Sequence, residues 1–265
     1  MEQVIFYLFI FMIGTVFGSF FTLAVYRIPL RKDITHERSY CPKCNHKLSF
    51  WDMIPILSYI FLGGKCRYCK EKIRIRYLLL EILTGTVFLL FAMSVNISFT
   101  TIEISKLIYM LLGFLYIAGI IIIAGIDKER YTINKGVLIY EVIINCLYIV
   151  YLYTLGQANI YRYAIYLFML FICIIAENTY LKRKLKDNYT LEILELSMVM
   201  AVFTKEVTYV ATVIITLLLI AVVGIAKNIL KKSSKNENEK IPFGFYLVCT
   251  NIASLIIMNF ITCGW

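Results

Sequence analysis

The sequence predicts an all-α polytopic membrane protein with about eight transmembrane helices and a small cytoplasmic four-cysteine zinc domain. Three observations predict this class. Of the 265 residues, 60% are hydrophobic and only 17% are charged, and the mean hydropathy is +0.77. Several apolar runs reach the length of about 20 residues that a helix needs to cross a bilayer. Two Cys-x-x-Cys pairs lie in one polar loop. This composition excludes an ordinary water-soluble globule.

Seven apolar runs are long enough to span a membrane: 4–26, 77–97, 104–126, 136–155, 160–181, 207–226 and 242–262. An eighth segment, 191–203, is shorter and contains Glu192 and Glu195. We interpret it as a short span, with a buried re-entrant element as the alternative. The first run opens with Glu2 and has no Ala-x-Ala exit, which favours a retained anchor over a signal peptide.

The basic residues predict the orientation of these spans. With eight spans, the segments after the first, third, fifth and seventh carry 12, 3, 4 and 5 Lys or Arg, which is 24 of the 27 in the chain. The positive-inside rule places these four segments in the cytoplasm and both termini outside. The net charge of +10 is therefore read as membrane topology, with the lipid bilayer and not nucleic acid as the partner.

The longest basic segment, residues 27–76, contains Cys41, Cys44, Cys66 and Cys69. Two Cys-x-x-Cys pairs separated by 21 residues have the spacing of a tetrahedral site with four thiolates. The alternatives are two disulfides, which a reducing cytoplasm disfavours, and four free thiols. Four sulfur ligands leave no open position on the metal, so we predict structural and not catalytic zinc. The chain then divides into an N-terminal anchor (1–30), a zinc-knuckle domain (31–76) and a seven-helix membrane domain (77–265).

Several motifs together resemble one family, the type IV prepilin leader peptidase/N-methyltransferases. They lie at residues 14–20, 25–29, 38–40, 51–59, 76–85 and 241–244. The resemblance implies a membrane aspartic endopeptidase that removes the short leader of type IV prepilin or pseudopilin precursors at the cytoplasmic membrane face of a bacterium. It also implies N-methylation of the new N-terminus from S-adenosylmethionine. No nucleotide-binding fingerprint occurs in the sequence, so this second activity and its cofactor rest on the resemblance alone.

The resemblance assigns the first catalytic acid to Asp127, because residues 125–134 fit the family's pattern of an aspartate just past a span. Without the family, a single acid at the end of an apolar span is more often a helix-end charge than a catalyst. An aspartic protease needs a second carboxyl group that shares a proton with the first. The predicted topology places the acids of residues 187–195 on the same side as Asp127.

The family's second aspartate lies in a Gly-x-Gly-Asp motif that this sequence lacks. One alignment places that aspartate at Glu192, and another places it at Thr190. Glu192 preserves a carboxyl group, so a dyad of Asp127 and Glu192 is the catalytic prediction. Thr190 as the match would break the dyad. A separate alternative is that Glu192 and Glu195, at positions i and i+3 of a short helix, face an aqueous cleft or bind the basic residues 182–186. The alternative function is a peptidase-inactive relative that acts as a methyltransferase or scaffold in pilus assembly.

Overall fold

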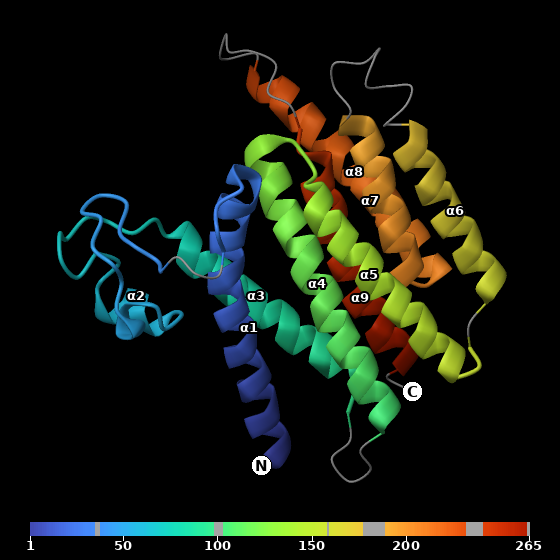
Figure 1. Cartoon of the computed structure of the whole chain (residues 1–265), viewed down its shortest axis with the longest axis horizontal. Helices are drawn as coiled ribbons and strands as arrows, with labels where there is room; N and C mark the ends of the chain where they lie inside the picture. The colour runs from blue at the N-terminus through green and yellow to red at the C-terminus, as the bar shows by residue number, and fades with distance from the viewer. Residues whose placement is uncertain (35–37, 98–102, 158, 177–188, 232–240, 264–265) are drawn as a thin grey trace. The chain divides into compact units, whose positions relative to one another are not determined.

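The computed structural model describes residues 1–34, 38–97, 103–157, 159–176, 189–231 and 241–263 (Figure 1). These residues form α-helices, two 3-10 turns and two isolated β-bridges, and no strand occurs among them. The helices are α1 (Glu2–Arg27), α2 (Leu57–Phe61), α3 (Arg76–Val95), α4 (Ile104–Arg130), α5 (Lys135–Thr154), α6 (Ile160–Ala176), α7 (Tyr189–Phe203), α8 (Glu206–Lys231) and α9 (Phe243–Cys263). The predicted all-α polytopic class is confirmed.

Each apolar run of the sequence coincides with one of these helices. Six described helices, α1, α3, α4, α5, α8 and α9, are long and apolar enough to cross a membrane. The other two segments form shorter helices, α6 with 17 residues and α7 with 15. The basic residues 182–186 and the connector at 232–240 lie outside the described residues.

The chain divides into two compact units, Met1–Met110 and Leu111–Trp265. In the first unit, α1 packs against α3 through small residues. A Cβ atom added to Gly14 would lie 2.8 Å from the Cα atom of Gly85, and one added to Gly18 would lie 2.9 Å from the Cα atom of Glu81. Gly14 and Gly18 are four residues apart and share one helix face. Such small-xxx-small stripes allow helix backbones to approach closely within lipid.

The segment between α1 and α3 is the one predicted to form a zinc knuckle, and we call it the zinc-knuckle segment. Asp52 braces it, because its Oδ2 atom accepts hydrogen bonds from the backbone N–H and the hydroxyl of Ser49, at 3.1 and 2.7 Å. Its Oδ1 atom accepts one from Nε of Arg67 at 2.6 Å. The backbone N–H of Ile56 donates to Oε2 of Glu81 in α3 at 2.8 Å. The segment is thus anchored to a membrane helix as well as joined to it along the chain.

The second unit has an aromatic core between its helices. The ring of Tyr116 in α4 stacks on Phe203 in α7 with centroids 4.1 Å apart, and the Tyr148 ring of α5 lies 4.5 Å from Phe203. The Tyr116 hydroxyl donates to Oδ1 of Asn251 in α9 at 2.8 Å. These contacts join four helices around one buried layer.

Arg162, in the first turn of α6, caps the far end of α7. Its Nη2 atom donates to the carbonyl oxygens of Ala201 and Thr204 at 3.2 and 2.8 Å, and its Nε atom lies 3.6 Å from Glu206 at the start of α8. The beginnings of α6 and α8 therefore lie beside the end of α7. This arrangement is the up-and-down alternation typical of helix bundles.

Candidate functional site

The four cysteines predicted as metal ligands converge on one point in the first unit. Their Sγ atoms all lie within 4.8 Å of one another, and those of Cys41 and Cys69 are 3.8 Å apart. Tetrahedral zinc with bonds of about 2.3 Å to sulfur requires sulfur atoms about 3.8 Å apart. The cluster could therefore hold a metal ion of that size and preference.

The two cysteine pairs share one backbone design. In the first, the N–H of Asn45 donates to the carbonyl of Cys41 at 2.8 Å, and in the second the N–H of Lys70 donates to the carbonyl of Cys66 at 3.1 Å. Asn45 and Lys70 both adopt left-handed backbone conformations, with φ of 56° and 59°. Each turn thus directs two sulfur atoms toward the same centre.

The thiols of the cluster differ in acidity. A hydrogen bond from the backbone of Cys44 outweighs desolvation and lowers the pKa of Cys41 to about 7. A backbone hydrogen bond from Glu71 favours the thiolate of Cys69, but desolvation and the neighbouring thiols raise its pKa to about 12. Without a metal ion the cluster keeps some of its protons, so metal binding would release them.

In the second unit, Asp127 lies where three helix ends meet. Its side chain is completely buried at the end of α4. Its Oδ2 atom accepts a hydrogen bond from the backbone N–H of Phe245 in α9 at 2.8 Å, and its carboxylate also hydrogen-bonds the Tyr189 side chain of α7. The Tyr189 oxygen accepts the N–H of Phe243 at 2.8 Å. Asp127 and Tyr189 together satisfy backbone donors at the start of α9.

Gly244 makes this close approach possible. A Cβ atom at this position would lie 3.0 Å from Oδ2 and 3.2 Å from Cγ of Asp127. A larger residue would push the first turn of α9 away from the carboxylate. Within the 241–244 motif, Gly244 is thus the residue that lies directly against Asp127.

Glu192, the predicted second acid, lies one turn after Tyr189 in α7. Its Oε2 atom accepts the backbone N–H of Ile133 at 2.9 Å, in the turn that follows α4. Thr190 is exposed and Glu195 is buried, at 1% exposure. Asp127 and Glu192 thus both lie near the C-terminal end of α4. Their pairing as a catalytic dyad stays a prediction.

Sequence reasoning missed Tyr189 as a partner of Asp127. No local pattern singles it out, because the contact joins residues 62 positions apart. It also left Glu141 unassigned, and this side chain is fully buried in α5 against Gly119 of α4. A buried acid within a span was the available signal for Glu141.

The N-terminal third of the chain has known relatives. Residues 12–95 match the family model described as Bacterial Peptidase A24 N-terminal domain. A prepilin leader peptidase/N-methyltransferase from Myxococcus xanthus is 42% identical over 84 residues, which are 32% of this chain and 25% of that protein. Its counterpart from Vibrio cholerae is 41% identical over 85 residues, 29% of this chain and 34% of that protein. A third, from Klebsiella pneumoniae, is 30% identical over 136 residues, 48% of this chain and 55% of that protein.

The chain therefore spans between a quarter and a little over half of the length of these relatives. No solved structure matches it. The matched residues 12–95 include the second part of α1, all of α3 and all four clustered cysteines. The predicted resemblance to the prepilin leader peptidase/N-methyltransferase family is thereby confirmed, and the part of the chain that matches the family's N-terminal domain is the part that carries the cysteine cluster.

Proposed function

We propose that this chain processes type IV prepilin or pseudopilin precursors at the cytoplasmic face of a bacterial inner membrane, removing their short leader with Asp127 as an aspartic-protease acid. The observation that supports this proposal best is the convergence of α4, α7 and α9 on the Asp127 carboxylate. Three chain segments of the second unit fix this one acid at a helix end.

In the proposed mechanism Asp127 and Glu192 share one proton, so that one activates water and the other protonates the scissile carbonyl. Glu192, in the first turn of α7, reaches the turn that follows α4, where its carboxylate accepts the backbone N–H of Ile133. Because Asp127 is completely buried, water and the substrate peptide reach it only after the Tyr189 side chain or the first turn of α9 moves. Substrate binding would supply that displacement.

The cysteine cluster would hold structural zinc in the cytoplasm and fix the fold of residues 31–76.

N-methylation with S-adenosylmethionine as donor is the second proposed activity, supported by the names of the relatives. The proposed orientation has both termini outside and the four basic segments inside, as the positive-inside rule requires.

A second candidate function is that of a peptidase-inactive relative acting as a methyltransferase or scaffold in pilus assembly. One observation favours it: the groups bonded to the Asp127 carboxylate are the Tyr189 side chain and the N-terminus of α9. This arrangement is a helix cap, and a helix cap alone explains a buried aspartate.

The test is incubation of the purified full-length protein with a prepilin-like peptide and S-adenosylmethionine, read by mass for leader loss and methyl gain. Asp127→Asn and Glu192→Gln should each reduce cleavage by at least about a hundredfold, while Glu195→Gln has a mild effect. Tyr189→Phe should leave cleavage in place, because its hydroxyl is no part of the dyad.

If Glu192→Gln cleaves normally and Glu195→Gln loses cleavage, the second catalytic acid is Glu195 and not Glu192. A wild-type protein that cleaves none of the pilin-like substrates of its own organism, yet methylates processed peptide, would establish the second candidate and reject the first.

A further inference from the structure

The zinc-knuckle segment exposes a cluster of large apolar side chains, which we call the aromatic patch: Phe50, Trp51, Leu57, Ile60 and Phe61. Their exposed fractions are 71%, 69%, 51%, 62% and 83%. Three of them lie on one face of the short helix α2, at positions i, i+3 and i+4. Exposed apolar clusters of this kind mark interaction surfaces.

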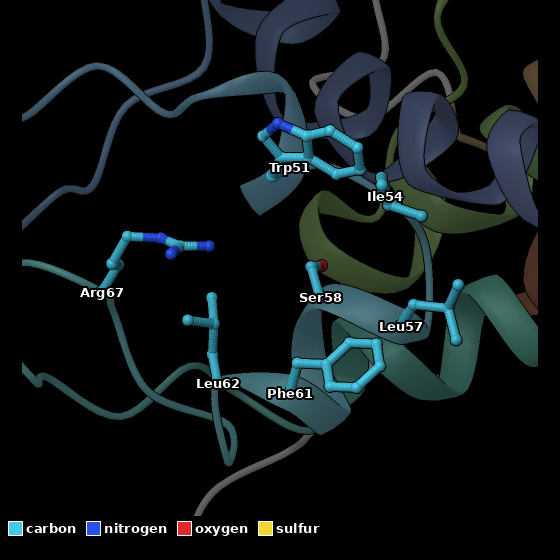
Figure 2. Close-up of a pocket in the computed structure, with 7 residues that line it drawn as sticks. All are labelled: Trp51, Ile54, Leu57, Ser58, Phe61, Leu62 and Arg67. Atoms are coloured by element: carbon cyan, nitrogen blue, oxygen red, sulfur yellow. The ribbon is translucent and has the colours of Figure 1, made fainter.

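A pocket of about 340 Å³ opens within the patch. Figure 2 shows Trp51, Leu57 and Phe61 around it, with the Arg67 side chain reaching in from a neighbouring loop. Arg67 is bound to Asp52, whose side chain is 2% exposed. The pocket wall is therefore apolar, with one fixed cation at its edge.

A hydrogen bond ties the segment that carries the patch to the beginning of α3. Ile56, between Trp51 and α2, donates its N–H to Glu81 of α3 at 2.8 Å. Glu81 is five residues past the start of α3, a distance of about 7.5 Å along the helix axis. Interfacial helices bury their apolar faces about 5–10 Å into the boundary between headgroups and acyl chains. A patch held this close to the start of a helix long and apolar enough to cross a membrane lies within reach of that boundary.

The backbone at this anchor is strained. Ile56 has φ 62° and ψ −55°, and the N–H of Leu57 donates to the carbonyl of Pro55 at 2.6 Å. This is a classic γ-turn, which is rare and costly for a β-branched residue. Strained turns persist where the surrounding structure holds them, and here Glu81 does so.

The charge around the patch selects the partner. Residues 27–76 contain 12 basic and 4 acidic residues. A basic segment with exposed tryptophan and phenylalanine is typical of an interfacial membrane-binding element, and anionic lipid headgroups attract it. Both ends of the segment are already tethered to the membrane by α1 and α3.

We infer that the aromatic patch is a membrane-docking surface, which inserts into the headgroup boundary of the leaflet at which α1 ends and α3 begins. The insertion holds the zinc-knuckle segment flat against anionic lipid instead of leaving it free in solution. The proposal does not depend on proteolysis or methyl transfer.

The chain offers a direct test, because Trp51 and Trp265 are its only tryptophans. The full-length Trp265→Phe protein is placed in vesicles of phosphatidylcholine and phosphatidylglycerol, with bromine atoms on the acyl chains either near the headgroup or near the chain end. We expect a blue-shifted Trp51 emission that the shallow bromines quench more strongly than the deep ones. Acrylamide in the water should quench it weakly.

Phe61→Ser should red-shift the Trp51 emission and lose most of the quenching by shallow bromines. Tyr68→Ser is the matched control, because Tyr68 is exposed in the same segment but is not part of the aromatic patch, and its ring centroid lies 3.5 Å from that of His46. It should leave the quenching unchanged. The metal content of each variant is measured as well, and a variant that has lost its metal has failed to fold.

A Trp51 emission that acrylamide quenches fully and bromolipids do not would overturn the proposal. So would shielding of Trp51 that appears only when a prepilin-like peptide is added, since the patch would then dock a peptide and not the lipid surface.

Discussion

The four clustered sulfur atoms of residues 41–69 show how individual residues set the properties of the first unit. Their spacing fits a tetrahedral ion, and the small segment that carries them has little apolar core of its own. Metal binding would then supply a large part of its folding free energy.

We therefore predict about one bound zinc ion per chain and its loss in Cys41→Ser and Cys66→Ser, with trypsin cutting the 38–76 loop faster in both variants. Elemental analysis measures the metal. Cys146→Ser, in α5, is the control and should keep the zinc. Well-folded wild-type protein without metal would contradict this prediction.

Asp52 gives the same segment a pH dependence. Desolvation raises the pKa of its carboxyl, but hydrogen bonds from Ser49 and the Arg67 guanidinium outweigh this and hold the pKa below its ordinary value. A carboxyl with a lowered pKa in the folded state stabilises the fold above its unfolded pKa of about 3.9, and the contribution disappears as the pH falls through the folded value.

Asp52→Asn should therefore lower the free energy of unfolding at pH 7 by on the order of 1 kcal/mol, the typical effect of losing a side chain that caps backbone N–H groups. The difference in this free energy between the variant and the parent should disappear below about pH 4. Thermal unfolding of both proteins across this pH range, followed by Trp51 fluorescence, measures the effect. Glu71→Gln, an exposed acid nearby, should show no such difference. An Asp52→Asn effect that is the same at every pH would reject the assignment.

At the scale of elements, α1 and α3 depend on glycine for their contact. A Cβ atom at Gly14 would meet backbone at 2.8 Å, which only a shift of one helix could relieve. Overpacking of this kind typically costs about 1–3 kcal/mol.

Gly14→Ala should therefore lower the midpoint of thermal unfolding in detergent. Gly224→Ala in α8 is the matched control, because nothing lies within 4 Å of the Cβ it would add, and alanine favours a helix over glycine. It should be neutral or stabilising. Equal midpoints for Gly14→Ala and the parent would show that the two helices do not need this close approach.

At the scale of the whole molecule, the distribution of basic residues predicts how the chain is oriented in the membrane. The four most basic segments alternate with weakly charged ones along the chain. The second unit agrees in its helix directions, because Arg162 brings the starts of α6 and α8 to the end of α7, while the starts of α7 and α9 meet the end of α4.

Labelling of single added cysteines tests this orientation in intact cells. A membrane-impermeant maleimide should label Gln157→Cys, in the turn after α5, and should reach Ser233→Cys only after the cells are opened. Labelling of Ser233→Cys in intact cells would contradict the prediction and show the opposite orientation. The parent protein, with its native cysteines, gives the background.

The sequence alone determined the helices and the cysteine cluster of this protein. A bilayer demands about 20 apolar residues per crossing, so hydropathy marks each span locally, and the 160–176 and 189–203 helices also appear where apolar runs predict them. The cysteine pairs are equally local, since two residues between ligands fix a turn. The resemblance to the family could likewise be read from short motifs.

Only the tertiary structure decided what surrounds Asp127 and what anchors the aromatic patch. Tyr189 and Phe245 reach Asp127 from positions 62 and 118 residues later in the chain, and Glu81 binds Ile56 across 25 residues. No periodicity or spacing encodes such contacts, because they follow from how separate helices pack side by side. The sequence also offers two registers for the second acid, Thr190 and Glu192. In the structure Thr190 is exposed and Glu192 accepts the backbone N–H of Ile133, and the match of Glu192 to the family's aspartate stays a prediction.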